Sequence, residues 1–146
     1  MMIRLTPEQI SKSWDILRPP LAKSLPKSLG IDPMAMANIL YSLLEEDAQL
    51  WVYYKNTEAI ESGEPLAICM TAMVLEPIAK IKYLLVYALT AVGNLSKNDY
   101  ENGLDTLRSF AAGNRCSQIL AYAESDAVVR QLSTMGVVKV STLMRL

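Results

Sequence analysis

The chain contains no histidine and only two cysteines among its 146 residues. Histidine is the commonest general base near neutral pH and the commonest metal ligand. Its absence therefore excludes serine–histidine triads, cysteine–histidine pairs and histidine-based metal sites. The two cysteines, Cys69 and Cys116, do not form a CxxC pair. We expect two free thiols in a reducing compartment, with no metal site and no redox pair.

The sequence has neither a large excess of charge of one sign nor a long apolar run. The 14 basic and 15 acidic residues leave a formal charge of −1, so no overall field attracts the chain to nucleic acid or to an anionic membrane. The longest apolar runs, LAICMTAMVL and YLLVYALTAV, reach about half of the roughly 20 residues that cross a bilayer. The polar N-terminal segment has no signal-peptide core. These features predict a soluble, non-exported protein without nucleic acid or membrane partners.

What the chain does contain is typical of one folded domain. Apolar residues make up 51% and charged residues 20% of the sequence, and no linker or repeat divides it. We predict a single domain over residues 1–146. The aromatic cluster Trp51, Tyr53 and Tyr54 could be a stacking platform for nucleic acid or part of a packed sheet. The lack of interleaved basic residues favours sheet packing.

Local capping signals mark the helices. Thr6 and Gln9 form a capping box at the start of the first helix, which Pro19 and Pro20 are expected to stop or kink. Ser96 and Asp99 form a second capping box, and the helix after it makes a crossover connection between two parallel strands. The expected elements are a strand at 1–5, helices at 6–18 and 32–44, strands at 50–55, 66–76 and 82–92, a helix at 96–113, a strand at 117–123, a helix at 125–136 and a strand at 137–146.

This order, β-α-α-β-β-β-α-β-α-β, resembles the GNAT (Gcn5-related N-acetyltransferase) fold over essentially the whole chain. The likeness is most specific in residues 82–146, which include the block SDAVVRQLSTMG. The resemblance implies an α/β fold, with a GNAT-like mixed sheet and helices on both of its faces.

The loop that would bind acetyl-CoA departs from the family pattern. GNAT enzymes carry a sequence similar to Arg/Gln-x-x-Gly-x-Gly/Ala after the fourth strand, where backbone amides cradle the diphosphate. The segment here is AVGNLSKNDYENGL, with only Gly93 and Gly103. Asp99 and Glu101 in the first helical turn would repel a diphosphate more than Lys97 attracts it. We therefore expect acetyl-CoA to bind weakly or not at all.

The catalytic groups that the resemblance implies are also missing. Aligning the family's last-helix glycine with Gly136 places Leu132 where the family has a proton-donating tyrosine, and leucine cannot donate a proton. We interpret Leu132 as a core residue. In the strand 82–92 the titratable side chains beyond Lys82 are Tyr83 and Tyr87, and an unperturbed phenol is too weakly basic to serve as a general base. Core packing is the favoured role of Tyr87, so we predict no catalytic, cofactor-binding or metal-binding residues.

From these departures we predict a non-catalytic GNAT-fold interaction or structural protein without a cofactor. A GNAT-like chain without the phosphate cradle and the catalytic groups resembles the degenerate acetyltransferase-like proteins of tailed bacteriophages. This resemblance implies a phage particle component in the host cytoplasm or in the virion. The alternative is a divergent acetyl-CoA-dependent N-acetyltransferase. We expect protein partners, as a homo-oligomer or as a subunit of a larger assembly. The surfaces expected to contact them are the apolar strand at 137–146 and the loop from Arg18 to Leu29.

Overall fold

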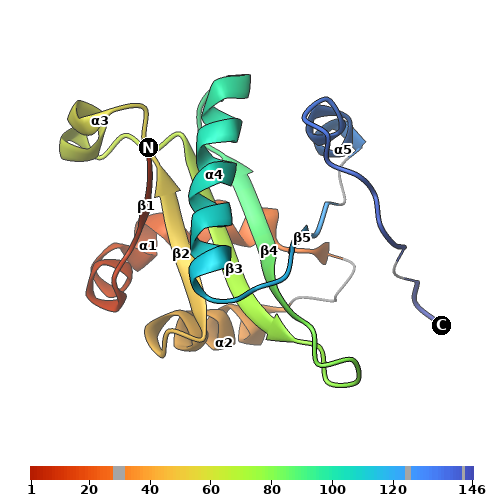
Figure 1. The fold of residues 1–146 in the computed structure, drawn as a ribbon. Helices are drawn as coiled ribbons and strands as arrows, with labels where there is room; N and C mark the ends of the chain where they lie inside the picture. The colour runs from red at the N-terminus through yellow and green to blue at the C-terminus, as the bar shows by residue number, and fades with distance from the viewer. Residues whose placement is uncertain (28–31, 124–125, 143) are drawn as a thin grey trace.

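A computed structural model describes residues 1–27, 32–123, 126–142 and 144–146. These residues form a mixed five-stranded sheet with α1 and α2 on one face and α4 on the other (Figure 1), so the predicted fold class is confirmed. The elements are β1 (Met2–Arg4), α1 (Pro7–Ser24), α2 (Pro33–Leu44), β2 (Ala48–Tyr53), α3 (Thr57–Ser62), β3 (Ala67–Leu75), β4 (Lys82–Ala91), α4 (Lys97–Gly113), β5 (Ile119–Ala121) and α5 (Asp126–Ser133).

The strands lie in sequence order across the sheet, from β1 to β5. Neighbours are antiparallel except for β4 and β5, which are parallel because α4 crosses over one face of the sheet between them. This arrangement agrees with the order expected from the sequence. It brings the C-terminal ends of β4 and β5 to the same edge of the sheet.

The first helix is longer than predicted. It begins at the capping box of Thr6 and Gln9, as expected, but it continues through Pro19 and Pro20 to Ser24. Of the two effects expected of these prolines, a stop or a kink, the stop is therefore wrong. Leu21 lies on the same face as Leu17 and is 0% exposed, so tertiary burial offsets the backbone hydrogen bonds that two prolines remove. Most of the predicted Arg18–Leu29 loop is consequently helical, and residues 28–29 lie outside the described residues.

Each face of the sheet carries its own apolar core. The core beneath α1 and α2 includes Ile10, Leu21, Ile39, Leu43, Leu50 and Ile68. The core beneath α4 includes Trp51, Cys69, Leu84, Val86, Leu107 and Ala111. Trp51 and Tyr53 are buried, which confirms that this aromatic cluster is sheet packing rather than an exposed stacking platform.

A small polar network is buried within β2 and β3. The Thr71 hydroxyl accepts a hydrogen bond from Trp51 Nε1 at 2.9 Å and donates one to Gln49 Oε1 at 2.8 Å. Gln49 Nε2 is buried and has no hydrogen-bond partner among the described residues. Because unpaired polar groups in a core are costly, this network makes the middle of the sheet sensitive to substitution.

The last predicted strand is not formed. The described residues 137–142 and 144–146 contain no strand and run away from the sheet (Figure 1), and Val138 is 75% exposed. Strand β5 pairs with β4 over only three residues, so it offers a short template for a further strand. The sequence pattern also missed α3, which Asn56 caps and which ends at Gly63 in a left-handed conformation.

Candidate functional site

The sheet opens where β4 and β5 part. Leu84, Leu85 and Val86 pair with residues 119–121, and the last contact is the hydrogen bond from Tyr122 N to Val86 O at 3.2 Å. Beyond it, residues 87–91 of β4 have no strand partner on this side in the described part of the chain. The backbone groups along this edge are therefore available to a ligand.

A β-bulge on β4 marks the same place. Thr71 of β3 faces Val86, whereas the neighbouring Met70 faces Ala88, so Tyr87 is an extra residue in β4. A bulge bends the strand and increases its local twist. Strand β4 therefore turns away from β5 at the residue that follows their last paired position.

A cavity of about 1370 Å³ lies along this opening. It is walled by α4, β5, α5 and residues 137–142, and most of its lining side chains are apolar. Small-molecule sites usually measure about 300–1000 Å³, so this cavity is large enough for an extended ligand. We call it the cleft.

Two tyrosines meet at the point of divergence, one from each strand. The rings of Tyr87 and Tyr122 are edge to face, with centroids 5.8 Å apart and an interplanar angle of 79°. Tyr122 lines the cleft and is 41% exposed, whereas Tyr87 is half-buried and packs on the core beneath α1 and α2. Burial raises the pKa of Tyr87, and the neighbouring Tyr122 adds to the effect. Tyr87 is therefore protonated at neutral pH, and its packing on this core agrees with the role that the sequence favoured.

Sequence reasoning did not single out Tyr122. Its only sequence signal is a tyrosine near the end of the strand expected at 117–123, which by itself is typical of many strand ends. The functional interest of Tyr122 comes from its position beside Tyr87, and that position depends on where β4 and β5 separate.

The acid at the start of α4 is turned inward. Asp99 is 5% exposed, and its Oδ2 atom accepts hydrogen bonds of 2.8 Å from both the backbone N and the hydroxyl of Ser96. Its Oδ1 atom accepts one of 3.0 Å from the Tyr53 hydroxyl and lies 3.6 Å from Lys55 Nζ. The hydrogen bond from the Ser96 backbone is the largest of the effects that lower the pKa of Asp99 to about 2.

The two acids at the start of α4 repel a diphosphate less than the sequence indicated. Asp99 is paired with Lys55 and serves the helix cap, while Glu101 lies 3.8 Å from Lys97 on the surface. The two carboxylates each have a cationic neighbour, and neither acts as an isolated negative charge at the helix start.

Replacing Asp99 by asparagine tests the role of this charge. Because the folded-state pKa lies below the ordinary value, the ionised group stabilises the fold above that ordinary value and loses its contribution as pH falls towards about 2. We expect Asp99→Asn to lower the free energy of unfolding at neutral pH, and the difference from the wild type to shrink steadily under acid. Urea denaturation at about pH 7 and about pH 2.5 measures both values.

The control is Glu101→Gln, which removes an exposed carboxylate from the same turn and is expected to change stability little. A stability deficit of Asp99→Asn that is equally large in acid would contradict the assignment, because it would then arise from lost packing rather than from lost charge.

Glycine in the loop after β4 has a packing role. A Cβ atom on Gly93 would lie 2.8 Å from Leu66 Cδ2, so the loop approaches the start of β3 closely. Gly103 lies in α4, where a Cβ atom would contact Met2 and Tyr53. Close packing accounts for Gly93, whereas an added Cβ at Gly103 would make only ordinary van der Waals contacts.

Leu132 is not a core residue, contrary to the sequence-based interpretation. It is half-buried in α5 and lines the cleft. The cleft lies between β4 and α5, and both elements contribute lining residues to it. Leu132 therefore faces the open space that a ligand would use.

The variant Leu132→Tyr distinguishes a position in the core from a position on the cleft. We expect its free energy of unfolding to stay within about 0.5 kcal/mol of the wild type, because the larger side chain extends into the cleft. The matched control is Leu43→Tyr in the core, which should lose about 1–3 kcal/mol through overpacking. Urea unfolding of both variants is the measurement. An equal loss in the two would show that Leu132 is packed after all.

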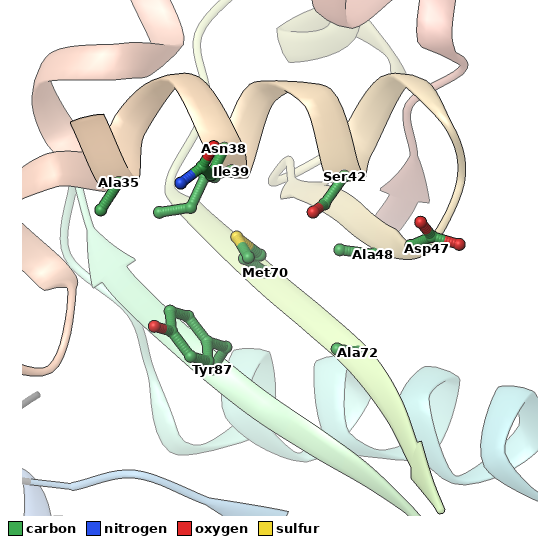
Figure 2. Close-up of a pocket in the computed structure, with 9 residues that line it drawn as sticks. All are labelled: Ala35, Asn38, Ile39, Ser42, Asp47, Ala48, Met70, Ala72 and Tyr87. Atoms are coloured by element: carbon green, nitrogen blue, oxygen red, sulfur yellow. The ribbon is translucent and has the colours of Figure 1, made fainter. Parts of the chain in front are cut away.

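A second, smaller hollow lies on the other face of the sheet (Figure 2). It measures about 300 Å³ and runs between α2 and strands β2 to β4. We call it the groove. Tyr87 lies towards one end and Asp47 towards the other, with Met70 between them. Tyr87 therefore belongs to the groove, and its partner Tyr122 belongs to the cleft.

Metal and membrane features can be assessed for the described ranges only. Within them, no three histidine, cysteine, aspartate or glutamate side chains gather closely enough to bind a metal ion. No helix in the same ranges combines the length and the apolar character that crossing a membrane requires.

The sequence matches no protein-family model and no curated protein. Solved structures do match. A ribosomal-protein-alanine N-acetyltransferase from Brucella melitensis has 14% identity and a TM-score of 0.64, covering 100% of this chain and 99% of that one. An aminoglycoside 6'-N-acetyltransferase from Acinetobacter haemolyticus has 12% identity and a TM-score of 0.66, covering 100% and 96%. A predicted acetyltransferase with acetyl-CoA from Clostridium acetobutylicum has 15% identity and a TM-score of 0.66, covering 100% and 94%.

The chain has the GNAT fold. The match extends over the whole chain and nearly all of each of these acetyltransferases, so the GNAT resemblance drawn from the sequence is confirmed for the fold. The prediction of a non-catalytic structural protein is corrected by the same finding, which favours the alternative of a divergent acetyltransferase. That prediction depended on an emptied site, and the structure instead has an open cleft between β4 and β5.

Proposed function

We propose that this protein is a divergent N-acetyltransferase that uses acetyl-CoA to acylate an amine. The observation that carries the proposal is the divergence of β4 from β5 at the Tyr87 bulge, over a cleft of about 1370 Å³. This geometry combines an unpaired strand edge, an apolar channel and a tyrosine hydroxyl at one place. The acetyltransferases of similar fold add support, although they share only 12–15% of their residues with this chain.

The cleft suits the extended arm of acetyl-CoA better than its phosphates. The free edge of β4 at residues 87–91 can pair with the amide groups of the arm, as an added strand would. Leu89, Leu104 and Leu107 line the cleft and can cover its methylene groups. The loop at 92–96 has no glycine-rich cradle, so fewer groups hold the diphosphate, and we expect weaker donor binding than a complete cradle would provide.

Acetyl-CoA supplies an acyl group on a thioester sulfur. In the transfer, the amine nitrogen bonds to the carbonyl carbon, the carbon–sulfur bond breaks, the nitrogen loses a proton to solvent and the sulfur gains one. We assign this proton to Tyr122, since its hydroxyl side chain lines the cleft where the strands part. Backbone N–H groups on the free β4 edge can stabilise the charge that develops on the carbonyl oxygen.

The test is the release of free thiol from acetyl-CoA in the presence of a panel of primary amines, together with calorimetric titration of acetyl-CoA into the protein. We expect a heat of binding and an amine-dependent release of thiol. Failure to bind acetyl-CoA, combined with no release for any amine, would overturn the proposal.

Two expectations from the sequence stay predictions. The first is the resemblance to acetyltransferase-like proteins of tailed bacteriophages, with its location in the host cytoplasm or the virion. The second is assembly with protein partners or with further copies of the chain. The exposed side chains of Val138, Val140 and Met144 support the second, because isolated proteins seldom expose apolar residues so close together.

A further inference from the structure

We propose that the groove between α2 and the sheet binds the acceptor, and that this acceptor is a small diamine whose second cation lies at Asp47. The inference rests on the proposed acetyltransferase function and extends it to a substrate class. In this arrangement the reacting amine lies at the Tyr87 end, an apolar carbon chain fills the groove, and the far ammonium group meets the carboxylate (Figure 2).

The tyrosine pair places one lining residue of each hollow side by side. Tyr87 lines the groove on one face of the sheet, and Tyr122 lines the cleft at its opening. Their ring centroids are 5.8 Å apart, so a molecule at the Tyr87 end of the groove lies next to the place where the donor's acyl group would react. Donor and acceptor can therefore approach the same point from opposite sides of the sheet.

The size and lining of the groove define the middle of the acceptor. Its volume of about 300 Å³ is at the lower end for ligand sites, which suits a short chain rather than a large ring system. Ile39, Met70 and Ala72 provide an apolar surface along its length. A stretch of methylene groups matches this surface, whereas a polar body would lose its hydration there without compensation.

The charge at the far end selects a cation. No lysine or arginine lines the groove in the described part of the chain, and the one acid among its lining residues is Asp47. The backbone N–H of Asp47 donates to Ser42 O at 2.9 Å, which holds this residue against the end of α2. The C-terminal end of a helix carries partial negative charge, and it adds to the attraction of a cation.

The described ion pairs near Asp47 leave its carboxylate available for a ligand cation. Arg4 lies 3.5 Å from Glu46, so the ion pair of the residue next to Asp47 is made by a different acid. The carboxylate of Asp47 makes no ion pair with any described residue. Asp47 is exposed, so its carboxylate is accessible to a ligand cation at this end of the groove.

Three acceptors of equal chain length test the inference: cadaverine, pentylamine and aminovalerate. They present an ammonium, a methyl and a carboxylate group at the far end. We expect KM to be lowest for cadaverine and highest for aminovalerate. Asp47→Asn should raise KM for cadaverine about two- to fivefold, as expected for an exposed ion pair, and Asp47→Lys should raise it further. The matched control is Glu58→Gln, which removes an exposed acid from α3 away from both hollows.

A second variant tests the position of the carbon chain. Ala35→Phe places a ring in the groove from α2, and it should raise KM for cadaverine and pentylamine alike while acetyl-CoA still binds with unchanged affinity. Unchanged KM values in Asp47→Asn and in Ala35→Phe would overturn the groove assignment while leaving acetyl transfer intact. If no amine is acetylated, the proposed function fails, and the groove is then judged by cadaverine binding. In that case, NMR shifts at Met70 and Asn38 that are lost in Asp47→Asn support it, and their absence overturns it.

Discussion

Replacing Tyr122 by phenylalanine is expected to lower kcat for acetyl transfer by about 10²- to 10⁴-fold, the usual range for a lost general acid. The phenyl ring keeps the edge-to-face contact with Tyr87, so the fold and the shape of the cleft are retained. What disappears is the hydroxyl that gives a proton to the departing sulfur. Steady-state kinetics at saturating acetyl-CoA measure the effect.

A donor with a better leaving group separates this chemical role from a structural one. The nitrothiophenolate released from a nitrothiophenyl thioester is a stable thiolate, so its departure needs no proton. We expect the rate with such a donor to fall much less in Tyr122→Phe than the rate with acetyl-CoA. Tyr41→Phe is the matched control, because its side chain is exposed on α2 and lines neither hollow, and its loss should be small. Equal losses with both donors would rule out proton donation by Tyr122.

Replacing Thr71 by valine is expected to lower the free energy of unfolding by about 2–6 kcal/mol. Thr71 is 0% exposed and joins Trp51 Nε1 to Gln49 Oε1 through its hydroxyl. Valine has nearly the same shape but can neither accept nor donate, so two buried groups lose their partner, at about 1–3 kcal/mol each. Gln49 Nε2 already lacks a partner among the described residues, so no nearby group compensates.

Two further variants show whether polar groups without hydrogen-bond partners cause the loss of stability. Thr71→Ser keeps the hydroxyl and should lose much less stability. Adding Gln49→Leu to Thr71→Val removes one of the stranded groups, so the double variant should be more stable than Thr71→Val alone. Urea denaturation measures all four proteins. If Thr71→Val unfolds at the wild-type urea concentration, the network contributes nothing to stability.

Local signals were enough to predict most elements of the fold. The capping boxes of Thr6 with Gln9 and of Ser96 with Asp99 start α1 and α4 at the expected residues. The parallel pairing of β4 and β5 also follows from the sequence, because a helix between two strands forces a crossover. These features depend on a few neighbouring residues or on chain connectivity, and both are visible in a sequence.

The candidate site could not be predicted in the same way. A family pattern with fixed positions indicates no catalytic residue in this chain. It places Leu132 in the core, and it treats Asp99 as a charge that repels a diphosphate. The structure places Leu132 on the cleft and pairs Asp99 with Ser96, Tyr53 and Lys55. Most of these contacts join residues that are distant in the sequence and close in space, which a pattern of fixed positions does not contain.

The contrast has a single physical origin. Helix starts, strand order and the exclusion of histidine chemistry are properties of local sequence and composition, so the amino-acid sequence determines them by itself. The continuation of α1 through two prolines depends on the burial of Leu21, and the approach of Tyr87 to Tyr122 depends on a bulge in β4 and on the three-residue pairing with β5. Such features arise when packing free energy outweighs local preference, and only the assembled sheet and helices decide where that happens.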